Sequence, residues 1–187
     1  MKLVLVSCCA PCSAGAIRQL HDGAIPDVDD FIVLFFNPNI FPAAEYQKRL
    51  AEQIKYCDAL GVKHVELEYD HAAWRAAVSG MEDAPERGVR CSACFEFRFR
   101  RAVEFARENG YDAVASVLGV SRHKDQSQVD RAALQVMPPA LAGDDATRPG
   151  VTYVPIKWDE ALRVKIGRDS QFYRQNYCGC EFSIRKL

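Results

Sequence analysis

The chain has 187 residues, of which 49% are hydrophobic, and its formal net charge is −1. This length is typical of one globular domain, so we expect residues 1–187 to form a single domain. No run approaches the ~20 apolar residues of a membrane-spanning helix, and the N-terminal stretch lacks the apolar core of a signal peptide. These features argue against membrane-spanning and secreted classes and predict a soluble, cytoplasmic protein.

Helix and strand patterns alternate along the chain. In chain order, they predict a strand at 2–7, a helix at 14–23, a strand at 30–37, a helix at 45–61, a strand at 63–69, helices at 72–78 and 91–110, a strand at 112–120, a helix at 124–136, a strand at 152–158 and a helix at 161–175. The segment 138–150 is predicted to be a loop or an insertion. Such alternation indicates βα units with right-handed crossovers. The predicted fold class is α/β, with a mostly parallel sheet flanked by helices on both faces.

Three thiols follow the first predicted strand, in the segment CCAPCS at residues 8–13. In a parallel sheet, ligands bind beyond the carboxyl ends of the strands, and a nucleotide-binding relative would carry its glycine-rich phosphate loop at this position. No such loop occurs here. The sequence therefore predicts thiol or metal chemistry at this edge of the sheet.

Seven of the eight cysteines fall in three clusters, which are Cys8, Cys9 and Cys12, then Cys91 and Cys94, then Cys178 and Cys180. Disulfides are rare in a reducing compartment, so clustered thiols are typical of metal binding or redox catalysis. Seven thiols exceed the four that a structural zinc or a single iron–sulfur cluster takes. Iron–sulfur, zinc and thiol redox chemistry all stay open on spacing alone. Cys57 lies on the apolar stripe of a predicted helix, and we expect it to be a core residue.

Polar residues follow two other predicted strands at the same edge. Asn37 and Asn39 lie between two prolines after the second strand, which is a pattern of a turn or of a substrate-binding loop. In SRHKD at 121–125, His123 could protonate a leaving oxygen and Lys124 could bind a phosphate. Asp125 is better placed to cap the following helix than to bind a metal.

The basic residues are unevenly distributed. They gather in 98–107, as Arg98, Arg100, Arg101 and Arg107, and near the C-terminus, as Arg163, Lys165, Arg168, Arg174, Arg185 and Lys186. Either group could bind RNA although the net charge is near zero, and either could equally be a solvated helix face. Tyr173, Arg174 and Tyr177 precede the last cysteine pair, and aromatic residues interleaved with arginine can stack an unpaired base.

Five segments occur together in the order of a known family. They are CCAPCS at 8–13, FNPNIFPAAEYQKR at 36–49, RCSACFEFR at 90–98, SVLGVSRHKD at 116–125 and FYRQNYCGCEFS at 172–183. Over residues 2–183 the chain resembles the QueH-type epoxyqueuosine reductases, which are cobalamin-independent enzymes of the last step of queuosine formation in tRNA. Family members often have Thr and Ser-Pro in the segment 116–125, so the resemblance gives Ser116 and Arg122 no direct role. The insertion at 138–150 also looks longer than is usual.

The resemblance implies a Rossmann-like fold of the PP-loop and nucleotide-hydrolase group. It implies a [4Fe-4S] cluster with a second iron ion close by, and candidate ligands among Cys8, Cys9, Cys12, Cys91, Cys94, Cys178 and Cys180. The implied substrate is tRNA carrying epoxyqueuosine at the anticodon wobble position, reduced with electrons from a donor that the sequence does not identify. His123 and Tyr177 are the candidate proton donors, and Asn37, Asn39, Lys124 and Arg174 the candidate substrate-binding residues.

Two rival interpretations stay open. One is a zinc module that has a structural or binding role without redox activity. The other is a tRNA-thiolating relative that uses ATP, and the absence of a glycine-rich phosphate loop in CCAPCSAG argues against it.

Overall fold

The structure is a computed structural model and describes residues 1–137 and 150–184. Residues 138–149 of the predicted insertion, and the basic residues Arg185 and Lys186, lie outside the described residues. No helix in the described ranges is long and apolar enough to cross a membrane.

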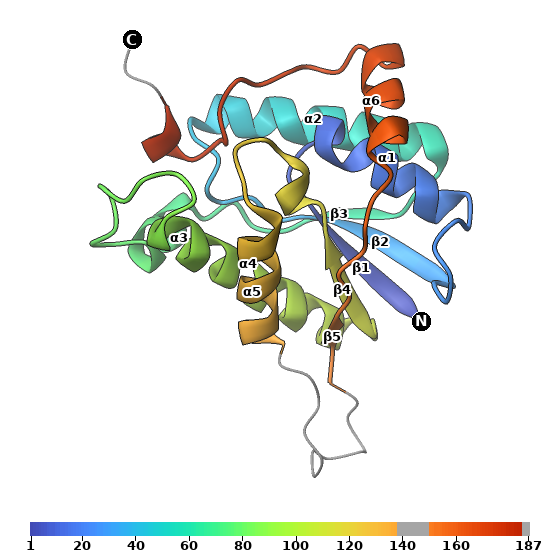
Figure 1. The fold of residues 1–187 in the computed structure, drawn as a ribbon, viewed down its shortest axis with the longest axis horizontal. Helices are drawn as coiled ribbons and strands as arrows, with labels where there is room; N and C mark the ends of the chain where they lie inside the picture. Colours follow the sequence, from blue (N-terminus) through green and yellow to red (C-terminus); the bar gives the residue numbers. More distant parts are fainter. Residues whose placement is uncertain (138–149, 185–187) are drawn as a thin grey trace.

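Five strands form one parallel sheet in the order β3-β2-β1-β4-β5 (Figure 1). The strands are β1 (Lys2–Ser7), β2 (Asp30–Phe35), β3 (His64–Glu66), β4 (Ala113–Ser116) and β5 (Thr152–Tyr153). Central β1 pairs with β2 on one side and β4 on the other, and its Leu3–Val6 segment is fully buried. The parallel α/β class predicted from the sequence is confirmed.

Helices cover both faces of the sheet (Figure 1). They are α1 (Ala10–His21), α2 (Ala43–Leu60), α3 (His71–Ala77), α4 (Val89–Glu108), α5 (Gln126–Val136) and α6 (Glu160–Asp169), with short 3-10 helices η1 (Leu118–Val120) and η2 (Glu181–Ser183). Helix α1 packs on α2 and α6, whereas α4 packs on α5. Two predicted helix boundaries are confirmed. Gly61 ends α2 in the left-handed conformation, and the Asp125 carboxylate caps the N-terminus of α5.

The last helix is shorter than predicted. It ends at Asp169 instead of residue 175, and the chain continues across α1 and α2 as an extended segment, residues 170–180, which we name the C-terminal strap. Helix α6 has no fully buried residue, so little packing would stabilise further turns. Phe172 is instead buried against Ala10 and Ala14 and contacts the Tyr56 ring edge to face, which fixes the direction of the strap.

Helices α1 and α6 approach most closely at Gly15. A Cβ at this residue would lie 2.9 Å from the Cα and Cβ of Arg163, which is closer than real Cβ atoms come. We expect Gly15→Ala to cost about 1–3 kcal/mol of overpacking, more than the roughly 0.5–1 kcal/mol that alanine gains over glycine within a helix.

Gly167 on α6 provides the matched control, because a Cβ there would meet no heavy atom within 4 Å. Urea unfolding should show Gly15→Ala destabilised and Gly167→Ala neutral or slightly stabilised. If both variants unfolded at the wild-type midpoint, the close contact between α1 and α6 would not exist as described.

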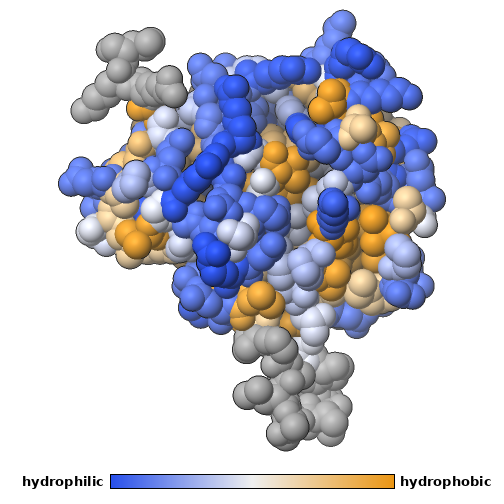
Figure 2. Space-filling model, viewed as in Figure 1, coloured by the Kyte–Doolittle hydropathy of each residue, from blue (hydrophilic) through white to orange (hydrophobic). Residues whose placement is uncertain are grey.

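The surface of the described residues is largely hydrophilic on the face drawn in Figure 2, where apolar residues lie in small groups between polar ones. That face shows no broad apolar area, among the residues described, of the kind that extensive protein interfaces bury.

Candidate metal and substrate site

The site lies at the carboxyl ends of β1 and β4, the two neighbouring strands between which the strand order of the sheet reverses. Neighbouring strands β1 and β4 lead into helices on opposite faces, α1 and α5, so a crevice opens beyond their carboxyl ends. A cavity of about 540 Å³ occupies this place. Its walls come from the turn after β1, the loop after η1, helix α6 and the C-terminal strap. This volume is within the range of small-molecule sites.

The first group of thiols lies at the start of α1. Cys8, Cys9 and Cys12 are buried, and their sulfur atoms all lie within 4.8 Å of one another. Hydrogen bonds from the thiols of Cys12 and Cys9 hold the pKa of Cys8 well below its usual value. The same contacts raise the pKa of Cys12, because one negative charge is shared among three sulfurs. The N-terminal end of α1 also favours a thiolate.

The other two sequence clusters combine into a second group. Cys91 and Cys94 lie in the first two turns of α4, and the charge of Cys178 acts on both thiols. Cys180 packs with Cys94 and Trp74 in one apolar cluster, and its burial raises its pKa to about 12. Cys178 lines the cavity together with Cys8 and Cys12, so each group contributes to the lining.

Four buried cations of the described residues lie near the thiols. They are each less than a tenth exposed, and they are Arg49, Arg90, Arg98 and Lys124. Burial by itself would lower the pKa of Lys124, but the charges of Cys8 and Cys178 raise it above its usual value. A buried charge is costly unless it is compensated, so these cations fit an interior that holds thiolates.

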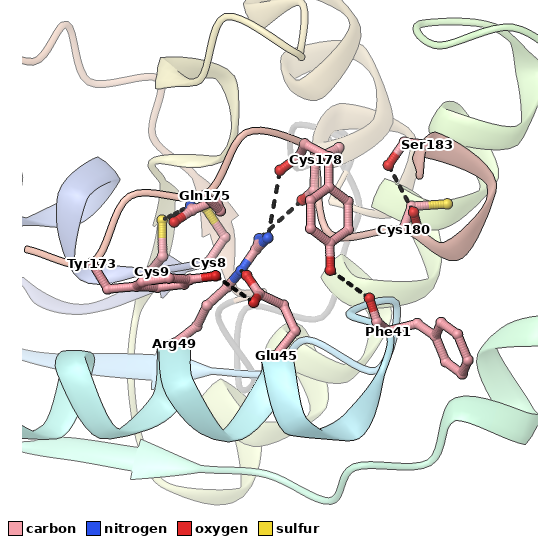
Figure 3. Close-up of polar contacts among 11 residues, drawn as sticks. Cys8, Cys9, Phe41, Glu45, Arg49, Tyr173, Gln175, Cys178, Cys180 and Ser183 are labelled. Atoms are coloured by element: carbon pink, nitrogen blue, oxygen red, sulfur yellow. Dashed lines mark hydrogen bonds and ion pairs between the residues drawn. The ribbon is translucent and has the colours of Figure 1, made fainter. Parts of the chain in front are cut away.

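Arg49 attaches the C-terminal strap to α2 (Figure 3). Its Nε donates to Glu45 Oε1 at 2.8 Å, and its Nη1 donates to the carbonyl of Cys178 at 3.1 Å. The Tyr173 hydroxyl donates to the other Glu45 oxygen at 2.7 Å. Gly179 has a φ of +107°, and a Cβ there would lie 2.7 Å from Arg49 Nη1. Glycine therefore lets the turn between Cys178 and Cys180 lie against the guanidinium.

Gln175 connects the strap to the first group of thiols. Its Nε2 donates to Cys9 Sγ at 3.0 Å (Figure 3), and its buried Oε1 has no partner among the described residues. Hydrogen bonds to cysteine sulfur are one means by which proteins tune a metal centre.

Four of the candidate catalytic and substrate-binding residues from the sequence line the cavity, namely His123, Lys124, Arg174 and Tyr177. His123 Nδ1 lies 3.9 Å from Glu86 Oε2. Their chemical roles stay predictions. The Tyr177 hydroxyl donates to the carbonyl of Phe41 at 2.6 Å, and burial raises the pKa of Tyr177 to about 12.

Asn37 and Asn39 do not line the cavity and are both buried. The Asn37 amide donates to the carbonyl of Ser7 at 2.9 Å and accepts from Arg98, so both of its ends are used within the fold. Asn39 Oδ1 has no hydrogen-bond partner among the described residues. Contact of either residue with substrate stays a prediction, and for Asn37 the observed role is to support the loop after β2.

The basic face predicted on α4 is not present in the form expected. Arg98 is 1% exposed and donates to the carbonyl of Phe36 at 3.1 Å. The prediction that Arg98 could belong to an RNA-binding surface is therefore wrong. Arg101 pairs with Glu68 at 3.0 Å and Arg100 with Glu96 at 3.8 Å. These arginines of α4 therefore contact the protein interior or neighbouring carboxylates.

The sequence interpretation missed Arg49 and Gln175. A signal for Arg49 was available, because it lies three residues after Tyr46 and four before Gln53, on the buried face of α2. A charged residue on an apolar stripe needs a partner in the interior. No local signal identified Gln175, whose contact with Cys9 joins residues 166 positions apart.

Comparisons with known proteins agree with these observations. A family model described as epoxyqueuosine reductase QueH matches residues 3–186. The epoxyqueuosine reductase QueH of Histophilus somni is 38% identical over 188 residues, which cover 98% of this chain and 72% of that protein. The QueH protein of Acinetobacter baylyi is 36% identical, with coverage of 98% and 81%.

A solved structure, the U34-tRNA thiolase NcsA from Methanococcus maripaludis with its [4Fe-4S] cluster, has a similar fold. The TM-score is 0.57 and the identity 13%, over 99% of this chain and 62% of that chain. This likeness concerns the fold alone. Because the family model matches nearly the whole chain, the protein belongs to the epoxyqueuosine reductase QueH family.

Proposed function

We propose that this protein is an epoxyqueuosine reductase that acts on epoxyqueuosine in tRNA, at the wobble position of the anticodon. Family membership supports this activity. The structural observation that carries the proposal is that Cys8 and Cys12 of the first group and Cys178 of the second line one cavity at the carboxyl edge of the sheet. A purely structural zinc site would use only four of the seven clustered thiols, and it would not require a cavity beside them.

The thiols fit an iron–sulfur centre with a second iron ion nearby, because thiolates are soft ligands that suit iron–sulfur clusters. The candidate ligands are Cys8, Cys9 and Cys12 in the first group and Cys91, Cys94, Cys178 and Cys180 in the second. When bound, such a centre supplies single electrons and a Lewis-acidic position for the epoxide oxygen. The electrons come in turn from a separate donor protein or reductant.

The reaction converts an epoxide into an alkene and releases the oxygen as water, which consumes two electrons and two protons. Lys124 lines the cavity and is buried, and its positive charge would stabilise negative charge on the departing oxygen. His123 lines the same cavity and is the better placed of the two candidate proton donors. The Tyr177 hydroxyl is already engaged with the carbonyl of Phe41.

We expect His123→Phe to lower kcat by about 10²–10⁴-fold, the usual contribution of a general acid. Tyr177→Phe is the matched control and should keep a rate close to wild type, because the Tyr177 hydroxyl is engaged with the carbonyl of Phe41. A full rate in His123→Phe would remove His123 from the mechanism.

The proposed function is tested by purifying the protein without oxygen and measuring iron, zinc and sulfide per chain. About four to five irons with about four sulfides are expected, together with reduction of epoxyqueuosine in tRNA when a chemical reductant is supplied. Zinc without sulfide after anaerobic reconstitution would show instead that the thiols serve a structural site.

A further inference from the structure

The walls of the cavity carry a marked excess of positive charge. Among the described residues, its lining includes five arginine and lysine side chains and neither aspartate nor glutamate. The five are Arg49, Arg122, Lys124, Arg163 and Arg174. Such a field attracts polyanions, and low-dielectric walls strengthen it.

The five cations differ in depth. Arg49 and Lys124 are buried beside the thiols, whose negative charge they compensate. Arg163 forms an ion pair with Glu160 on the same helix. Arg122 and Arg174 are exposed, and neither forms an ion pair with a carboxylate among the described residues. The charge at the mouth of the cavity therefore has no partner within the described chain.

These two arginines come from different parts of the fold. Arg122 lies in the loop after η1, where its carbonyl accepts from Arg87. Arg174 lies in the C-terminal strap, and its Nη2 donates to the carbonyl of Gly167 at 3.0 Å. That bond orients the guanidinium and leaves most of its five donors for a ligand. A pair of guanidinium groups from two walls is suited to bidentate contacts with phosphates.

We propose that Arg122 and Arg174 bind the two backbone phosphates that flank the modified nucleotide. The inference rests on the proposed function. A cavity of about 540 Å³ accommodates one nucleoside and excludes a base-paired stem. To reach the thiols, the modified base must therefore be turned out of the anticodon loop. Its 5′ and 3′ phosphates then lie at the mouth, where the two arginines hold them.

The test is RNA binding by Arg122→Gln and Arg174→Gln, measured by fluorescence anisotropy with a labelled anticodon stem-loop at several salt concentrations. Each variant should bind more weakly, and the slope of log K against log salt should decrease in magnitude by about 0.7–1 per variant. The control is Arg107→Gln, an exposed arginine on α4 that does not line the cavity. Slopes equal to wild type in both variants would overturn the proposal.

Measurements of RNA binding and of turnover distinguish the phosphate-clamp proposal from the reductase proposal. Weaker RNA binding by each variant, with a higher KM for the RNA, is the result expected of a phosphate clamp. If the two variants show the predicted decrease in slope but the iron-loaded wild-type protein does not reduce epoxyqueuosine, only the reductase proposal fails. If it reduces epoxyqueuosine while both variants keep the wild-type slope, only the clamp fails.

Discussion

Cys8→Ala is expected to lose bound iron and more than about 100-fold of its activity. Outer partners of metal ligands already contribute 10–100-fold, and Cys8 is itself a candidate ligand, with a thiol pKa well below the usual value. It lines the cavity, and its sulfur lies within 4.8 Å of those of Cys9 and Cys12. The readouts are iron and sulfide per chain after anaerobic reconstitution, and turnover with epoxyqueuosine in tRNA.

Cys57→Ala is the control for this experiment. Cys57 is also fully buried, but it packs in the core and accepts a hydrogen bond from Gln53 at 3.4 Å. Its replacement should cost some stability and leave the iron content unchanged. Equal iron and turnover in Cys8→Ala and Cys57→Ala would contradict a metal site at the start of α1. Parallel variants at Cys94 and Cys178 extend the same test to the second group of thiols.

Arg49→Met is expected to destabilise the protein by about 3–5 kcal/mol, because it leaves the buried Glu45 carboxylate without its cation. The side chains of Arg49 and Glu45 are only 2% and 8% exposed. For a domain of this size, the loss corresponds to a decrease in Tm of about 6–20 °C. The variant should also bind less iron, because the bond from Arg49 to the Cys178 carbonyl no longer holds the strap in place.

Two further variants distinguish the role of Arg49 in compensating the charge of Glu45 from its role in positioning the C-terminal strap. Arg101→Met removes an arginine whose partners are largely exposed, and it should cost less than about 1 kcal/mol. The double variant Glu45→Gln with Arg49→Met removes the unpaired charge, so it should recover part of the stability but not the iron content. Recovery of both would mean that Arg49 contributes charge compensation and no positioning of the strap.

The sequence by itself determined the family, the α/β class and the edge of the sheet at which the thiols lie. These follow from local patterns. Alternating periodicities specify strands and helices, and a turn that follows a parallel strand must lie at the carboxyl edge. The ends of α2 at Gly61 and the cap of α5 at Asp125 were predictable for the same reason, since backbone conformation and capping depend on adjacent residues.

The tertiary structure alone decided which distant residues meet. Periodicity identifies a buried face but not the segment that covers it, so Arg98 looked like a surface charge although it is bonded to the loop after β2. The combination of Cys91 and Cys94 with Cys178 and Cys180 depends on the path of the strap, which Phe172 and Arg49 fix by packing and hydrogen bonding across more than a hundred residues. Contacts of such long range leave no local pattern in the sequence, and they assemble the site.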